Sequence, residues 1–85
     1  MADKSYNGLG NAYYEIKEYD KAIQVYLKCI EINPQFSPPY YGIGIAYKHK
    51  SMMEQSIEWL KKSANIDPSY EVPYNALGNV YLQLK

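Results

Sequence analysis

The sequence predicts an all-α protein built from repeated helix pairs, with about five helices in a single domain that spans residues 1–85. Two observations support this fold class. Apolar residues recur at spacings of three and four along most of the chain, which is the period of an amphipathic helix. The same residue pattern also returns after 34 residues, and periods of this length are typical of arrays in which each copy is one supersecondary unit.

The 34-residue period keeps residue type and spacing together. Four positions recur in three copies: Tyr6, Tyr40 and Tyr74; Leu9, Ile43 and Leu77; Gly10, Gly44 and Gly78; Tyr13, Tyr47 and Tyr81. Three more recur in two copies: Ile23 and Ile57; Ile32 and Ile66; Pro34 and Pro68. The chain therefore divides into repeat one (3–36), repeat two (37–70) and a partial repeat or capping helix (71–85).

Repeat one predicts helices near 4–16 and 20–32. Each has an apolar stripe on one face, formed by Tyr6, Leu9, Tyr13 and Ile16 in the first and by Ala22, Ile23, Tyr26 and Ile30 in the second. Lys17 and Glu18 form a polar break between the two stripes. Asn33 precedes Pro34, and a residue before proline avoids the helical region, so the second helix ends there.

Repeat two predicts helices near 38–50 and 53–66, and the partial copy predicts one near 72–84. Ser37 before Pro38 is typical of an N-cap followed by proline in the first turn. The segment from Ser51 to Glu54 fits a capping box, in which serine and glutamate each pair with a free backbone amide. Asp67 before Pro68 ends this helix as Asn33 ends its counterpart.

Glycines in the middle of predicted helices need a reason, because glycine there costs roughly 1 kcal/mol against alanine. Gly10, Gly44 and Gly78 occupy the same position of the period. We expect each to allow close approach of the paired helix, with the small residues Ala22 and Ser56 facing the first two.

This pattern resembles the tetratricopeptide repeat, over residues 3–85. The family repeats every 34 residues and places aromatic, aliphatic, small and proline residues at fixed positions. The matching residues are Tyr6, Leu9, Gly10, Tyr13, Ala22, Tyr26, Cys29 and Pro34 in copy one; Tyr40, Ile43, Gly44, Tyr47, Ser56, Leu60, Ser63 and Pro68 in copy two; and Tyr74, Leu77, Gly78 and Tyr81 in the partial copy. The resemblance implies an α-solenoid, in which antiparallel helix pairs stack into a short right-handed superhelix.

The sequence departs from the family pattern at two kinds of position. Cys29, Ser56 and Ser63 stand where alanine is usual, and these small exchanges keep the fold plausible. Lys17 and Ser51 stand where glycine is often found in the turn between paired helices. We therefore expect those two turns to be strained or differently shaped.

The resemblance implies that the first helices of successive copies line a concave groove, which family members use to hold peptides or partner helices. The candidate binding residues on the non-core faces of these helices are Asn7, Asn11, Tyr14, Tyr41, Ile45, Lys48, Asn75 and Asn79. Asparagines four residues apart point the same way on a helix, and their amides can both donate to and accept from a peptide backbone. An alternative interpretation is that asparagine is simply common at two of these family positions, those of Asn11 and Asn79.

The function predicted from this resemblance is a non-enzymatic scaffold for protein–protein interaction. Some family members hold an acidic C-terminal chaperone tail with a clamp of lysine, arginine and asparagine, but only Asn11 matches that set here. The other clamp positions carry Asn7, Gly42, Val72 and Ala76, which supply no paired cations for a carboxylate. We therefore expect a different protein or peptide partner.

Composition excludes several other classes of function. Nine basic and nine acidic residues cancel, so nothing favours nucleic acid or an anionic membrane. His49 and Cys29 are the only residues of their types and give no metal-ligand spacing, and no phosphate-binding motif follows a strand. We therefore expect no enzyme activity, no metal and no cofactor. Without a signal peptide or a long apolar run, we expect a cytoplasmic protein.

The last predicted helix lacks the polar outer face that a terminal repeat needs, because it carries Leu77, Val80, Leu82 and Leu84. One explanation is that the chain is part of a longer array. The other is that this face pairs with a second copy and forms a homo-oligomer. Self-association through the repeat faces and this helix is therefore the alternative function to peptide binding.

Overall fold

The computed structural model describes residues 2–84 as five helices, with no strand in that range. The helices are α1 (Ala2–Glu15), α2 (Tyr19–Ile32), α3 (Pro38–His49), α4 (Met53–Ile66) and α5 (Val72–Gln83). The first and last residues of the predicted 1–85 domain lie outside the described residues. The helix bounds confirm the sequence prediction to within about two residues, as expected where prolines and a strict period mark the ends.

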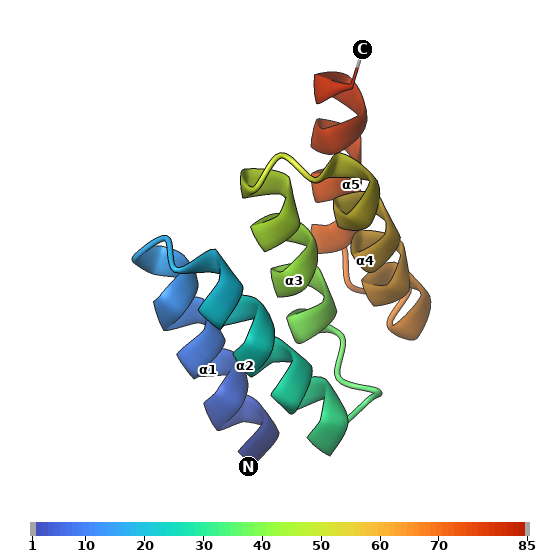
Figure 1. The fold of residues 1–85 in the computed structure, drawn as a ribbon. Coiled ribbons are helices and arrows are strands. Elements are labelled where there is room, and N and C mark those ends of the chain that lie inside the picture. The colour runs from blue at the N-terminus through green and yellow to red at the C-terminus, as the bar shows by residue number, and fades with distance from the viewer. Residues whose placement is uncertain (1, 85) are drawn as a thin grey trace.

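The helices form two layers in a stack (Figure 1). α1 pairs with α2 and α3 with α4, α2 also packs on α3 and α4 on α5, and α1, α3 and α5 are neighbours along one side. No Cα atoms of α2 and α4 approach within 8 Å of each other in the described chain. Helices in contact on one layer and separated on the other give a curved stack, with α1, α3 and α5 on its inner side. This arrangement confirms the predicted solenoid of helix pairs.

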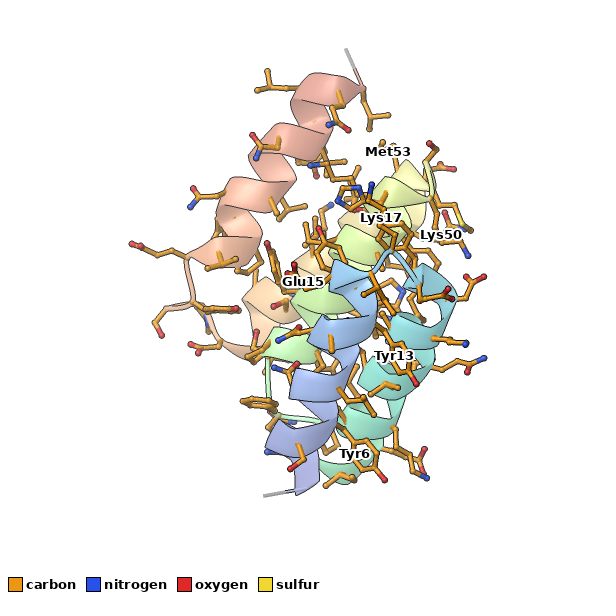
Figure 2. The ribbon with its side chains drawn as sticks, turned by 90° about the vertical axis from the view of Figure 1, so that its left-hand side faces the viewer. Tyr6, Tyr13, Glu15, Lys17, Lys50 and Met53 are labelled. Atoms are coloured by element: carbon orange, nitrogen blue, oxygen red, sulfur yellow. The ribbon has the colours of Figure 1, made fainter. Side chains whose placement is uncertain are left out.

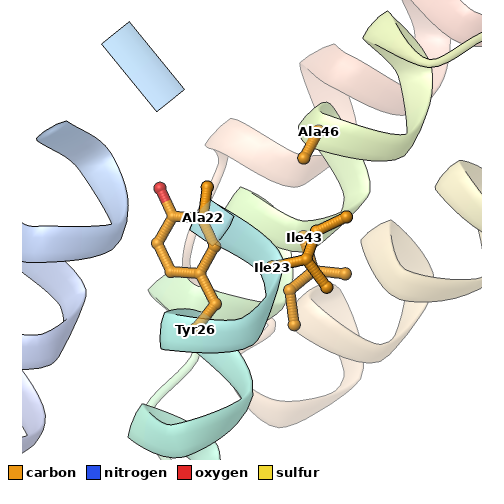
Figure 3. Packing of buried hydrophobic residues seen from close by; sticks show 5 residues of the cluster. All are labelled: Ala22, Ile23, Tyr26, Ile43 and Ala46. Carbon is orange, nitrogen blue, oxygen red and sulfur yellow. The ribbon is translucent and has the colours of Figure 1, made fainter. Parts of the chain in front are cut away.

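The largest part of the core lies between α2 and α3 (Figure 3). Its buried members are Ala22, Ile23, Tyr26, Ile43 and Ala46. A second, smaller cluster joins α4 to α5 through Leu60, Ala76 and Val80. Cys29 is fully buried, as a small apolar residue of a helix core would be.

The Tyr26 ring occupies a slot between two helix backbones. A Cβ atom on Gly10 of α1 would lie 2.6 Å from one ring carbon, and a Cβ on Gly42 of α3 would lie 2.5 Å from another. Both distances are far below van der Waals contact, so the ring fits only because both residues are glycine. The nearest atoms to Gly10 thus belong to Tyr26 and not to Ala22, which corrects the prediction: a large ring, and not a small side chain, fills this space.

The other two glycines of the period differ from each other. A Cβ on Gly44 would lie 2.7 Å from Leu60 and 3.2 Å from the backbone oxygen of Ser56, which confirms close approach and the predicted neighbour Ser56. A Cβ on Gly78 would meet no heavy atom within 4 Å. Close packing at Gly78 is therefore wrong for the described chain, because no helix lies over that side of α5.

The turns within the two helix pairs have the same strained geometry. Lys17 and Ser51 have φ of 66° and 63°, the left-handed region that favours glycine. The amide after each of them donates to a carbonyl five residues back, from Glu18 to Tyr13 and from Met52 to Tyr47, both at 2.9 Å. These are Schellman turns, and they confirm the expected strain.

Two predicted helix caps need correction. The capping box is wrong because Ser51 closes α3, while Met52 holds the N-cap position of α4 without a side-chain bond. Ser37 does precede α3 at the N-cap position, but its hydroxyl makes no cap. That hydroxyl instead donates to the backbone oxygen of Ser63 at 2.8 Å, and the two serine hydroxyls lie 2.7 Å apart in the core. A tertiary hydrogen bond therefore replaces the local one.

Candidate functional site

Two adjoining hollows cross the inner layer of the stack. The first, of about 220 Å³, lies between α1 and α3, and its lining residues are Asn11, Tyr14, Glu15, Tyr26, Tyr41, Gly42 and Ile45. The second, of about 260 Å³, lies between α3 and α5, and its lining residues are Tyr14, Tyr41, Ile45, Lys48, His49, Val72, Asn75, Ala76 and Asn79. Because Tyr14, Tyr41 and Ile45 line both, the hollows form one trough, which we call the concave surface.

The predicted site residues are almost all brought together here. Seven of the eight line the concave surface, namely Asn11, Tyr14, Tyr41, Ile45, Lys48, Asn75 and Asn79. Asn7 lines neither hollow, and its side-chain oxygen is enclosed without a hydrogen-bond partner among the described residues. The placement follows from helical spacing, because Tyr6 and Tyr13 turn toward α2 (Figure 2) and leave Asn11 and Tyr14 on the other side of α1.

Sequence reasoning missed the contribution of Tyr26, which we assigned only to the core. Its ring is 2% exposed, but its hydroxyl passes between α1 and α3, reaches the concave surface and donates to the side-chain oxygen of Asn11. A phenol is protonated at neutral pH, and burial raises the pKa of Tyr26 further, so its hydroxyl acts as the donor to the Asn11 oxygen. This bond orients the Asn11 amide so that its NH₂ group is available to a ligand. The sequence carries no local signal for this role, because the space for the ring is formed only where Gly10 of α1 and Gly42 of α3 come together.

An aromatic cluster closes the trough where α1, α2 and α3 meet. The ring of His49 stacks on Tyr19, with centroids 5.3 Å apart and planes 1° from parallel, and Tyr14 meets both edge-on. The Tyr14 hydroxyl and His49 Nε2 are also hydrogen-bonded at 2.9 Å. These contacts hold the Tyr14 ring in place, and burial raises the pKa of its hydroxyl.

The concave surface is mostly neutral. Of the described side chains that line it, Lys48 carries the single fixed positive charge and Glu15 the single negative one. The phenols of the trough are uncharged at neutral pH, and burial raises the pKa of Tyr41 as well. Such a surface suits a ligand that offers amide groups and apolar side chains more than one that offers several charges.

A larger hollow of about 430 Å³ lies on the other layer of the stack. Its lining residues are Ile30, Tyr40, Trp59, Lys62, Asn65 and Ile66. Trp59 is half-buried there, with Lys62 Nζ 4.2 Å from the centre of its ring and Tyr40 beside it. These contacts pack Trp59 on the outer layer.

The described residues contain neither a metal-binding cluster nor a membrane-spanning helix. No group of three or more histidine, cysteine, aspartate or glutamate residues in the described part of the chain is arranged to hold a metal ion. Within residues 2–84, no helix combines the length and the apolar character that crossing a bilayer requires.

The fold and its open inner layer define an α-solenoid of helix pairs. Family models described as tetratricopeptide repeat match residues 3–36 and 37–70, and the chain belongs to this family. None of the curated proteins matches the sequence.

Solved structures of tetratricopeptide repeat proteins share the fold. The chain is similar to MamA, with a TM-score of 0.89 and 26% sequence identity, and the match covers 98% of this chain and 48% of that one. It is also similar to the Sgt2 domain from Aspergillus fumigatus, with a TM-score of 0.89 and 26% identity over 96% of this chain and 54% of that one. A third similar fold is the second repeat domain of Spaghetti (RPAP3) bound to the HSP90 peptide SRMEEVD. Its TM-score is 0.91 at 19% sequence identity, and the match covers 99% of this chain and 78% of that one. The chain thus spans about half of the MamA and Sgt2 chains.

Proposed function

We propose that this chain is a non-enzymatic interaction module that binds a peptide or a partner helix on its concave surface. The observation that carries the proposal is the continuity of the trough across three helices, since Tyr14, Tyr41 and Ile45 line both of its hollows. The trough offers aromatic and aliphatic contacts with polar groups at its edges, which is the kind of lining that binding sites use.

The binding mode follows from the chemistry of the two edges. Asn11 on α1 and Asn75 and Asn79 on α5 lie on opposite sides of the apolar centre. With its oxygen already bonded to Tyr26, the Asn11 amide donates to a carbonyl of the guest backbone, while the α5 amides can donate or accept. Apolar side chains of the guest pack on Tyr41 and Ile45.

Structural relatives are consistent with such a module. The RPAP3 domain is bound to an HSP90 peptide, and the repeat protein YrrB is described as having an unusual peptide-binding site. Because Lys48 is the single fixed cation among the described residues that line the trough, we do not propose the same kind of acidic ligand here. The partner we propose is a largely uncharged peptide segment.

The test begins with peptides selected from a random library on the immobilised chain, whose dissociation constants are measured by isothermal titration calorimetry. Because a hydrogen bond contributes about 0.5–1.5 kcal/mol, replacing both Asn11 and Asn79 with alanine should weaken binding about tenfold or more. Asn79→Ala alone, which leaves the Tyr26 contact intact, should produce part of this loss.

A matched control is available on the outer layer. Asn65 is an exposed helical asparagine of α4 that lines the other hollow, so Asn65→Ala should leave the affinity unchanged. Equal affinities for the wild type and the double variant would remove the proposal. A loss with Asn65→Ala alone would place the ligand on the outer layer and would also contradict it.

A further inference from the structure

The first hollow of the trough contains a carboxylate that the chain leaves without a counter-charge. Glu15, the last residue of α1, is exposed, and Figure 2 shows it on the side of α1 opposite to Tyr13, which packs toward α2. Its side chain lines the first hollow and forms no ion pair among the described residues. A guest on the concave surface therefore meets a negative charge that is free to pair.

Three tyrosines line the same hollow. Tyr14 and Tyr41 have half-buried rings there, and Tyr26 contributes its hydroxyl. Burial is the main cause that raises the pKa of the Tyr14 and Tyr26 hydroxyls, and the negative charge of Glu15 adds to both shifts, which agrees with a carboxylate close to both. Because the aromatic cluster of α1, α2 and α3 holds the Tyr14 ring in place, this ring is ordered before a guest binds. Aromatic faces and a carboxylate both attract a positive charge.

The fixed cations near the trough lie outside the first hollow. Lys48 lines the second hollow, and Lys17 lines a separate recess at the turn between α1 and α2. The last turn of α1 contains no basic residue, and the helix dipole favours a cation near that end. The two hollows thus carry opposite charge, negative in the first through Glu15 and positive in the second through Lys48.

We propose that the first hollow receives one basic side chain, arginine or lysine, of the peptide that binds on the concave surface. This inference rests on the proposed function and adds the residue type that the trough selects. The cationic group pairs with the Glu15 carboxylate and lies against the Tyr14 or Tyr41 ring. Because the first hollow adjoins the second, the same guest continues past Lys48 with neutral or acidic residues. A single basic residue agrees with a guest that is otherwise uncharged.

The test uses peptides selected from a random library on the immobilised chain and synthesised with acetylated and amidated ends, so that the charge belongs to a side chain. Each is also made with citrulline in place of arginine, or acetyl-lysine in place of lysine. For the wild type, isothermal titration calorimetry should show the charged form binding about fivefold to tenfold more tightly, because the ion pair is partly exposed and the rings add to it. Glu15→Gln should bring this ratio close to one and leave the affinity of the neutral form almost unchanged.

Glu54→Gln is the matched control, because it removes the same charge from an exposed glutamate of α4 that lines neither hollow. It should keep the wild-type ratio, and an equal loss there would reveal a general charge effect and overturn the inference. Selected peptides that bind without a basic residue, or a ratio that is the same in the wild type and Glu15→Gln, would also overturn it and leave the proposed function standing. If no peptide binds the chain at all, both fail.

Discussion

The two complete repeats share a backbone arrangement but fill it with different chemistry. In repeat one, the Tyr26 ring lies against Gly10 and sends its hydroxyl to Asn11 on the concave surface. In repeat two, the aliphatic Leu60 lies against Gly44, and serines take two places where the family usually has alanine. The period thus fixes which positions are small and which are large, and leaves open what the large side chain does at its far end.

The difference matters for function because only repeat one sends a hydroxyl from its large core side chain to the concave surface. A change at Tyr26 acts on the packing of α1 against α3 and on the orientation of the Asn11 amide together. Leu60 has no polar end and belongs to the cluster that holds α5. Repeat one therefore couples stability to the orientation of the Asn11 amide, whereas the α4–α5 cluster reaches the concave surface through the packing of Tyr41, Ile45 and Ala76.

The largest expected effect comes from Gly42→Ala, which disrupts the packing of repeat one. In Gly42→Ala the new methyl group meets the Tyr26 ring, which Gly10 holds from the other side, so the ring cannot move away. We expect the free energy of unfolding to fall by about 3 kcal/mol, near the top of the range for overpacked cores. Gly44→Ala should cost less, about 2 kcal/mol, because Leu60 is not held between two glycines as the Tyr26 ring is, although the Ser56 backbone oxygen also lies close.

Urea denaturation of both variants measures these losses, and Gly8→Ala supplies the reference for alanine in open space. That control should gain up to about 1 kcal/mol from helix propensity. If Gly42→Ala were no less stable than Gly8→Ala, the Tyr26 slot would not be the tight feature that distinguishes repeat one.

The next effect concerns the two serines of α4, Ser56 and Ser63, which are both fully buried. The Ser63 hydroxyl is bonded to Ser37, whereas that of Ser56 has no partner within the described residues. Ser63→Ala should lower the free energy of unfolding by about 1–2 kcal/mol, and Ser56→Ala should raise it by about 1 kcal/mol, because it removes an unpaired buried hydroxyl. Thermal and urea denaturation measure both changes in the free energy of unfolding. A loss of stability in Ser56→Ala would contradict the inference that its hydroxyl is buried without a partner among the described residues.

Much of this fold could be predicted from the sequence because its determinants are local and periodic. Prolines fix the ends of α2 and α4 by sterics, and the helical period alone separates the core face of α1 from the face that bears Asn11 and Tyr14. The surface positions of seven candidate site residues followed from that geometry, while their role in binding stays a prediction.

What could not be predicted depends on contacts between distant residues. The Tyr26 hydroxyl reaches the concave surface only because Gly10 and Gly42, on two different helices, leave a slot for its ring. The pattern from Ser51 to Glu54 fits a helix start as well as a helix end, and the Schellman turn of α3 decides between them. The enclosed oxygen of Asn7 likewise reflects how α1 packs in three dimensions.

The smallest expected effect sharpens the comparison, because it concerns a feature that both repeats share. Lys17 and Ser51 hold nearly the same left-handed φ with the same hydrogen bonds, and this conformation costs a residue with a Cβ roughly 1 kcal/mol. Glycine removes that cost but gains freedom in the unfolded chain, so Lys17→Gly and Ser51→Gly should each stabilise by about 0.5–1 kcal/mol and act additively. Gln24→Gly, at an exposed position in the middle of α2, should destabilise by about 1 kcal/mol and serves as the control in the same urea titrations. Equal gains at the two turns would show that the repeats differ in their cores alone, whereas unequal gains would show that the chemistry of each core also reaches its turn.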